Sequence, residues 1–161
     1  MRFKGCPRST LTLLCTLIVA QPAYSGQVPF SIQGPGVDPD DFRVTEFATG
    51  LNFPVGMVEL DDGSVLVATS NGGSFFGSSS GSLARLADTD GDGVSDVRQT
   101  LVSDVPSGKL SALRRSGDLV FVTGQGSGSP IAIYRLGAEA DDPLTLQGTI
   151  TISYSGGWLH P

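Results

Sequence analysis

The stretch DDGSVLVATS, residues 61–70, decides the fold of this chain, together with its counterpart SGDLVFVTGQ, residues 116–125. In both, Asp and Gly, which tolerate the positive φ angles of tight turns, precede a β-branched apolar segment. Gly63 and SVLVATS therefore match Gly117 and DLVFVTG, and LARLAD at 83–88 matches IYRLGA at 133–138. The matches predict an internal repeat of about 45 to 50 residues.

Short β-branched segments separated by turn residues continue from Phe42 along the chain. Such segments predict antiparallel strands, and four of them recurring at this period are typical of a β-propeller blade. We therefore expect an all-β propeller fold, with blade one at about 42–104, blade two at about 105–153 and the start of blade three at 154–161. A β-sandwich built from the same strands is the alternative, which the repeat disfavours.

Two blades cannot close a ring, because propellers typically contain about 4 to 8 of them. Each sheet of a propeller depends on its neighbour to cover an apolar face. An uncovered face would promote aggregation or pairing with another copy of the chain. We therefore expect the chain to be the N-terminal part of a longer protein.

The first 25 residues have the pattern of a signal peptide. Basic residues (Arg2, Lys4 and Arg8) precede the apolar run LTLLCTLIVA at 11–20, and small residues lead to a cleavage point after Ser25. A membrane-spanning helix needs about 20 apolar residues, so no transmembrane segment is expected in the mature chain. We predict an exported protein, periplasmic or extracellular, in which the Pro- and Gly-rich residues 26–41 form an extended leader.

Composition excludes several functions. The chain has 161 residues and a formal net charge of −6, and its ten basic residues are outnumbered by sixteen acidic ones, so nucleic acid is not an expected partner. Both cysteines, Cys6 and Cys15, lie in the predicted signal peptide, which leaves no thiol for disulfide, metal or nucleophile chemistry in the mature chain. His160 is the single histidine, which excludes a multi-histidine metal site within this chain.

An acidic loop, DTDGDGVSD at 88–96, lies between two predicted strands. Hard divalent cations prefer six to eight oxygen ligands, and alternate side chains of a curled loop can converge on one ion. Calcium is the expected metal. Its predicted ligands are the side chains of Asp88, Asp90, Asp92 and Asp96 and the backbone carbonyl of Val94.

The loop is not an EF-hand, because position twelve of that pattern requires a Glu and is Gln99 here, and no helix is expected on either side. It matches a shorter DxDxDG calcium loop that connects two strands. A solvated turn is the alternative, but four adjacent carboxylates would repel one another strongly without a cation. With no nucleophile or general base identifiable near it, the predicted site is structural rather than catalytic.

The stretch FATGLNFPVGMVELDDGSVLVAT, residues 47–69, contains a Gly-Leu, a Pro-x-Gly, an apolar strand, an Asp-Gly turn and a second apolar strand. This order resembles the opening blade of the soluble quinoprotein glucose and sorbosone dehydrogenases, six-bladed propellers that carry pyrroloquinoline quinone (PQQ) and calcium. The matching residues are Gly50, Leu51, Pro54, Gly56, Asp62, Gly63 and Leu66. The acidic segment 85–96 also resembles an insertion in bacterial relatives. The resemblance extends over about 42–161, but lactonase-like and other NHL-type propellers share these turns, so it indicates the fold more strongly than the reaction.

The resemblance implies oxidation of a sugar or polyol with PQQ as electron acceptor. In that family a histidine at the beginning of the third blade is the general base, and His160 in GGWLHP stands at a similar place. Two departures weaken the match: the Asp expected before this histidine is Leu159, and a glutamine expected near the start of blade two is absent from VPSGKLSAL at 105–113. The basic residues that would hold the quinone are expected beyond Pro161. A strand-end histidine without a catalytic role is the alternative.

Two functions therefore remain open. The first is an exported sugar or polyol dehydrogenase, and the second is a non-catalytic, calcium-stabilised propeller that binds carbohydrate or protein through its loops. Glycine-rich loops at 71–81 and 124–130 follow equivalent strands and are expected on one face, where binding surfaces commonly form. Phe75, Phe76 and Trp158 could stack on sugar rings, although packing in the core is the more common use of such side chains. A lactone hydrolase would require a Glu, Asn and Asp cluster, which is not evident here.

Overall fold

The computed structural model describes residues 32–151, except residues 43, 108 and 126–128. The predicted signal peptide, the predicted start of blade three and His160 lie outside this range. The described elements are a 3-10 helix, η1 (Pro39–Asp41), and the strands β1 (Pro54–Glu59), β2 (Val65–Ser70), β3 (Gly81–Ala87), β4 (Val97–Val105), β5 (Lys109–Ser116), β6 (Leu119–Gln125), β7 (Ile131–Arg135) and β8 (Thr145–Ile150). No helix long and apolar enough to cross a membrane occurs in this part of the chain.

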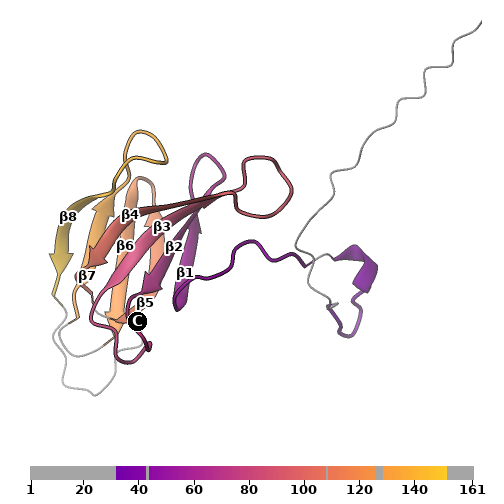
Figure 1. The fold of residues 1–161 in the computed structure, drawn as a ribbon, viewed down its shortest axis with the longest axis horizontal. Helices are drawn as coiled ribbons and strands as arrows, with labels where there is room; N and C mark the ends of the chain where they lie inside the picture. Colours follow the sequence, from indigo (N-terminus) through magenta and orange to yellow (C-terminus); the bar gives the residue numbers. More distant parts are fainter. Residues whose placement is uncertain (1–31, 43, 108, 126–128, 152–161) are drawn as a thin grey trace, which may run out of the picture.

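The strands form two antiparallel sheets of four, in the orders β1-β2-β3-β4 and β5-β6-β7-β8 (Figure 1). The prediction of an all-β fold is confirmed. The first sheet ends at Val105, next to the predicted boundary between the blades. Within the described residues the two sheets do not close into a ring.

The expected extended leader contains one turn of helix. Asp38 caps η1, since its side chain accepts a hydrogen bond from the amide of Asp40 at 3.0 Å, and Pro39 begins the helix with a φ angle already suited to it. In Figure 1 this segment lies apart from the two sheets.

One apolar core joins the two sheets. Leu66 and Ala68 of β2 and Val120 and Val122 of β6 are fully buried in the same cluster. These pairs occupy alternate positions of their strands, as side chains that share one face of a sheet must. Burial alternates along β6, whereas β2 is buried at every position from Leu66 to Ser70.

The sheets approach each other most closely where β5 packs against β1 and β2. Gly56 of β1 lies against Leu113 of β5, and further along both strands Arg115 donates to the carbonyl of Glu59 at 2.9 Å. Residue numbers increase together along the contact, so β1 and β5 run in the same direction. Figure 1 shows the strands of each sheet following one another in chain order from right to left.

The alternating strand directions place the connections at two ends of the sheets. We call the end formed by residues 60–64, 88–96, 117–118 and 136–144 the acidic end. The opposite end, the glycine-rich end, includes residues 71–80 and 129–130. Ser70 accepts from the amide of Leu110 at 3.0 Å and Ser107 donates to the carbonyl of Pro130 at 2.9 Å, which places both loops beside the start of β5. The expectation that these two loops share one face is therefore confirmed for the described residues.

Candidate functional site

The acidic loop connects β3 to β4 and folds around its own carboxylates. Both oxygens of Asp88 accept backbone hydrogen bonds, Oδ1 from the amide of Gly91 at 2.7 Å and Oδ2 from the amide of Gly93 at 2.8 Å. Gly91 and Gly93 have φ angles of 78° and 90°, a region that residues with a side chain rarely enter. The two glycines thus allow the chain to curl around Asp88.

Asp96 closes the loop from its other end. Its Oδ2 accepts the backbone amide of Thr89 at 2.8 Å and the Thr89 hydroxyl at 2.9 Å. These two bonds, led by the backbone one, lower the pKa of Asp96 and keep it ionised. Sequence reasoning did not include Thr89. The position of Thr89 between Asp88 and Asp90 could have indicated this role, because a threonine hydroxyl commonly forms hydrogen bonds with neighbouring groups of the same loop.

The base of the loop is tied to the sheet. The amide of Ser95 donates to the carbonyl of Phe47 at 2.8 Å, and the amide of Asp96 donates to the carbonyl of Ala87 at 2.9 Å. The Ser95 hydroxyl also donates to the carbonyl of Val97 at 2.8 Å. The loop therefore starts and ends in a fixed position.

Three of the five predicted ligands come together. Asp88, Asp90 and Asp96 each place a carboxylate oxygen within 4.8 Å of the others. Asp92 is not in this group: its Oδ1 accepts the amide of Val94 at 2.8 Å, and Asp90 accepts the amide of Asp92 at 3.1 Å. A carboxylate has about four lone-pair sites, so oxygens that accept one amide proton keep capacity for a cation. Carboxylate oxygens are the type of ligand that hard divalent cations prefer.

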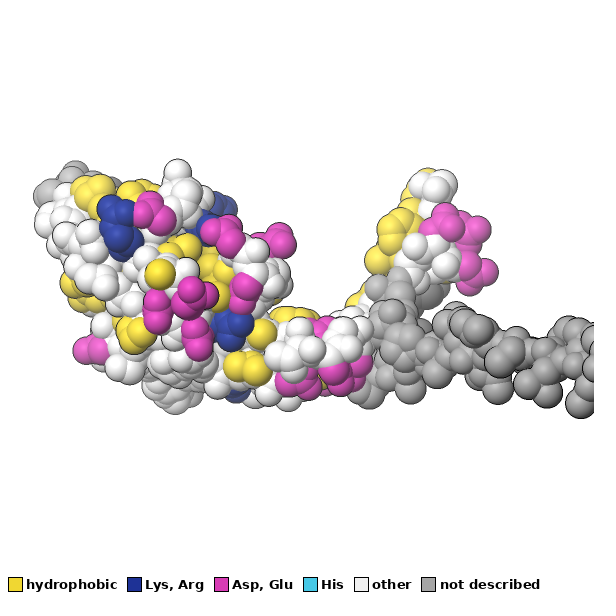
Figure 2. Space-filling view, turned by 90° about the horizontal axis from the view of Figure 1, so that it is seen from above, with side chains coloured by type: hydrophobic (Ala, Val, Ile, Leu, Met, Phe, Trp, Pro, Cys, Tyr) yellow, Lys and Arg dark blue, Asp and Glu magenta, His cyan; other side chains and the backbone are white. Residues whose placement is uncertain are grey.

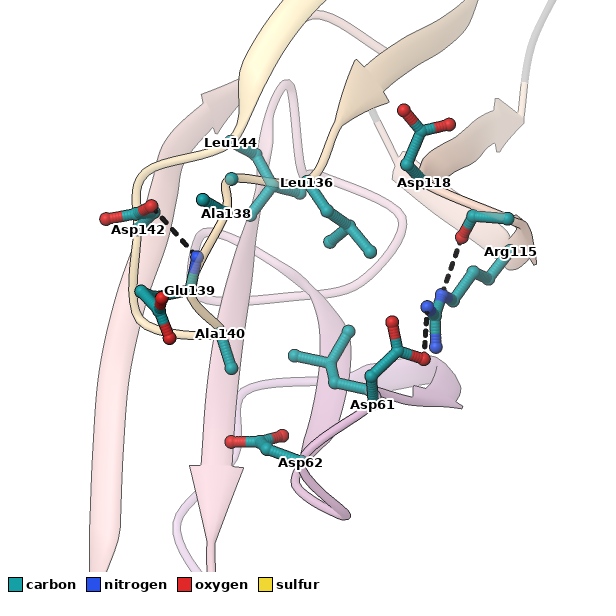
Figure 3. A pocket seen from close by; sticks show the side chains of 13 residues that line it. Asp61, Asp62, Arg115, Asp118, Leu136, Ala138, Glu139, Ala140, Asp142 and Leu144 are labelled. Atoms are coloured by element: carbon teal, nitrogen blue, oxygen red, sulfur yellow. Dashed lines mark hydrogen bonds and ion pairs between the residues drawn. The ribbon is translucent and has the colours of Figure 1, made fainter.

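A groove of about 680 Å³ lies at the same end, between the β1–β2 turn of the first sheet and the turns of the second (Figure 3). Arg115 crosses it, donating to Asp61 at 2.6 Å and to the carbonyl of Gly117 at 2.8 Å. Of the described residues that line the groove, Arg115 alone is basic. The acidic residues along its walls are Asp61, Asp62, Asp118, Glu139 and Asp142.

Each sheet also has its own Arg–Asp pair at this end. Arg85 of β3 donates to Asp62 at 2.6 Å and to the hydroxyl of Ser64 at 2.9 Å, and Arg135 of β7 pairs with Asp118. Burial raises the pKa of Asp62, but hydrogen bonds from Ser64 and Arg85 outweigh it and bring that pKa to about 2. Figure 2 shows this end from above, with acidic side chains (magenta) and arginines (dark blue) intermixed.

The residues that carry the family resemblance have structural roles. Gly50 and Gly63 adopt positive φ angles of 63° and 81°, and Gly56 allows β1 to approach β5. Leu66 is fully buried, and Asp62 caps the β1–β2 turn by accepting from the amide of Ser64 at 3.0 Å. These positions therefore report how the sheet is built, not a reaction.

His160, Leu159 and Trp158 lie outside the described residues, so the structure does not test the predicted catalytic histidine. Comparison with protein-family models, with curated proteins and with solved structures gives no match to this chain.

Proposed function

We propose that this chain forms two consecutive blades of an exported β-propeller that is stabilised by calcium and binds carbohydrate or protein through its glycine-rich end. The observation that carries this proposal is the parallel, adjacent course of β1 and β5. Blades related by rotation about a common axis have their first strands side by side and parallel, with later strands progressively farther out. Here the close contacts between the sheets also involve β1, β2 and β5.

A β-sandwich accounts for the same arrangement less well. Sandwich sheets face each other across a core about 10 Å thick along their whole area and usually exchange strands through Greek-key connections. Both sheets of this chain are simple meanders in chain order. Gly56, where β1 approaches β5, belongs to the Pro-x-Gly pattern that propeller families share.

Calcium binding is supported by the convergence of Asp88, Asp90 and Asp96. A divalent cation would neutralise their mutual repulsion and fix the loop between β3 and β4, which is a structural role. Extracellular calcium modules commonly bind with dissociation constants of about 10⁻⁴–10⁻³ M. That range suits an exported protein.

Calorimetric titration of calcium into the protein tests this part of the proposal. We expect one site per chain and a higher thermal midpoint in calcium, because a ligand that binds only the folded state stabilises it. Asp90→Asn and Asp96→Asn should each abolish binding. Asp141→Asn removes an exposed carboxylate elsewhere at the acidic end and is the matched control. Asp92→Asn tests whether the Asp92 carboxylate also coordinates calcium once the ion is bound. No heat and no midpoint shift in the wild type would reject the calcium site.

Oxidation of a sugar or polyol is the second candidate function, and the blade-opening pattern at residues 47–69 favours it. PQQ would supply the hydride acceptor, and His160 would take the proton from the substrate hydroxyl. The resemblance places no quinone-binding residue among the described residues. Dye reduction with aldoses, measured after reconstitution with PQQ and calcium and compared with His160→Ala, tests this activity. A folded protein without turnover would reject it.

A further inference from the structure

The groove between the two sheets at the acidic end has an apolar floor. Leu60 and Leu144 belong to the buried core that the sheets share, and Leu136 and Ala140 pack against this core. All four residues also line the groove. Its volume of about 680 Å³ lies within the range of about 300–1,000 Å³ that is usual for ligand-binding sites. The apolar core therefore reaches the surface at the bottom of this groove.

The walls of the groove carry negative charge from both sheets. Asp61 and Asp62 belong to the β1–β2 turn, Asp118 to the β5–β6 turn, and Glu139 and Asp142 to the β7–β8 loop. Figure 3 shows Glu139 and Asp142 on one side of the groove and Asp61 on the other. Carboxylates thus converge on the apolar floor from two sides, and the described lining contains a single guanidinium group.

Two of these carboxylates lie outside the ion pairs of the described residues. Asp61, Asp62 and Asp118 are each paired with an arginine, whereas Glu139 and Asp142 take part in none of these pairs. Asp142 accepts the backbone amide of Glu139 at 3.1 Å through one oxygen. A cation placed beside Glu139 and Asp142 would therefore gain attraction without breaking an existing ion pair.

The β7–β8 loop is held in place by contacts of its own. The amide of Asp142 donates to the carbonyl of Glu139 at 3.2 Å, and the Gln99 side chain of β4 donates to the carbonyl of Asp141 at 2.9 Å. Gly137 passes so close to Asp142 that a Cβ atom on Gly137 would overlap the Asp142 side chain. Because this wall is tied to both sheets, less conformational entropy would be lost when a ligand binds to it.

We propose that the groove binds a basic peptide segment of a partner protein. Its lysine side chains lay their aliphatic stems on the apolar floor and direct their ammonium groups to Glu139 and Asp142. Lysine commonly buries its methylene stem against apolar surface while its charged end stays among polar groups. Carboxylates on both walls match several positive charges along one chain better than they match a single small cation. The net charge of −6 also favours encounter with a basic partner.

Fluorescence anisotropy with a labelled peptide of alternating Lys and Gly tests the proposal on the full chain. An ionic strength of about 0.15 M screens charges that are more than about 8 Å apart. We expect saturable binding that Glu139→Gln combined with Asp142→Asn weakens about tenfold. Asp40→Asn combined with Asp141→Asn is the matched control, because it removes the same charge from two exposed positions outside the groove lining. The control should bind as tightly as the wild type.

Two further measurements examine the floor and the location of the site. A peptide with 2,4-diaminobutyric acid in place of Lys keeps the charge but shortens the aliphatic stem, and we expect it to bind about tenfold more weakly. Amide chemical shifts of the wild type should change mainly at residues 60–62 and 136–144 when the Lys peptide is added. This mapping does not depend on the stability of any variant.

Equal weakening by the two double variants would show attraction to net charge alone and would overturn the site. Absence of binding to the wild type, or shift changes away from the groove, would overturn it as well. If 1,5-diaminopentane binds the groove as tightly as the peptide, the occupant is a small amine and not a protein segment. The groove and the glycine-rich end lie at opposite ends of the sheets, so each of these failures leaves the proposed function untouched.

Discussion

Gly56 of β1 lies directly against Leu113 of β5: a Cβ atom on Gly56 would be 2.9 Å from the amide nitrogen of Leu113 and 3.0 Å from its Cβ. Only a residue without a side chain fits there, because real Cβ atoms do not approach backbone atoms so closely. The contact sets the spacing of the two sheets at their closest strands. It also explains why the Pro-x-Gly pattern has a glycine at position 56.

Gly56→Ala should lower the free energy of unfolding by about 1–3 kcal/mol, because the added methyl group must push β1 and β5 apart. Gly148→Ala in β8 is the matched control, since nothing lies within 4 Å of a Cβ placed there, and its stability should stay within about 0.5 kcal/mol of wild type. Urea denaturation of the three proteins measures the difference. Equal stabilities of the two variants would contradict the close contact.

Ser70→Ala should cost about 1–3 kcal/mol, because it leaves the amide of Leu110 without its acceptor in the core. Ser70 and Leu110 are both fully buried, and Ser70 Oγ accepts this amide at 3.0 Å. Hydrogen exchange gives a site-specific check, since the Leu110 amide should exchange faster in the variant. Ser79→Ala, on an exposed loop position, should change neither stability nor exchange.

Arg115→Gln should destabilise the protein more than Arg135→Gln. Arg115 joins the two sheets through the carbonyl of Glu59 and the carboxylate of Asp61, and its side chain is only 19 % exposed. Arg135 pairs with Asp118 inside one sheet and is 49 % exposed. Exposed ion pairs contribute about 0–1 kcal/mol, and Asp61 is 89 % exposed, so the larger loss expected for Arg115→Gln comes from its additional hydrogen bond to the Glu59 carbonyl, which joins the two sheets. Thermal or urea unfolding measures both, and a larger loss in Arg135→Gln would refute this account.

Much of the fold was predictable from local patterns. The Asp-Asp-Gly turn at 61–63 and the Gly-Asp turn at 117–118, each followed by an apolar segment, set the hairpins, because the positive φ of Gly63 and Gly117 is a local property. The number of sheets and the shared face of the two glycine-rich loops followed from the repeat. Whether the sheets belong to a closed propeller was not predictable from two repeats, because closure depends on partners beyond each sheet.

The sequence identified the acidic loop but not which of its carboxylates lie together. Spacing identified the acidic loop, but it could not separate Asp88, Asp90 and Asp96 from Asp92, since that depends on which carboxylates accept backbone amides. The Arg115 bridge was also missed, because it joins residues more than fifty positions apart in the sequence. Contacts of that kind are fixed by packing between the sheets and leave no local signal.

Stability should fall as the pH drops from about 4 to about 2, partly through Asp62. Burial raises the pKa of this carboxyl, but hydrogen bonds from Ser64 and Arg85 outweigh it and lower the pKa from the ordinary 3.8 to about 2. The unfolded chain therefore binds a proton in this window before the folded chain does. The contribution of Asp62 is fully present above pH 3.8 and is lost as the pH falls through about 2.

Asp62→Asn should accordingly be less stable than wild type near neutral pH and should lose less of its thermal midpoint on acidification. Arg85→Gln and Ser64→Ala remove the donors instead of the carboxyl and should flatten the same part of the profile. Arg135→Gln, which breaks the pair in the other sheet, is the control and should keep the Asp62 part of the slope. Parallel profiles for wild type and Asp62→Asn between pH about 4 and about 2 would show that the pair at this turn does not couple to folding.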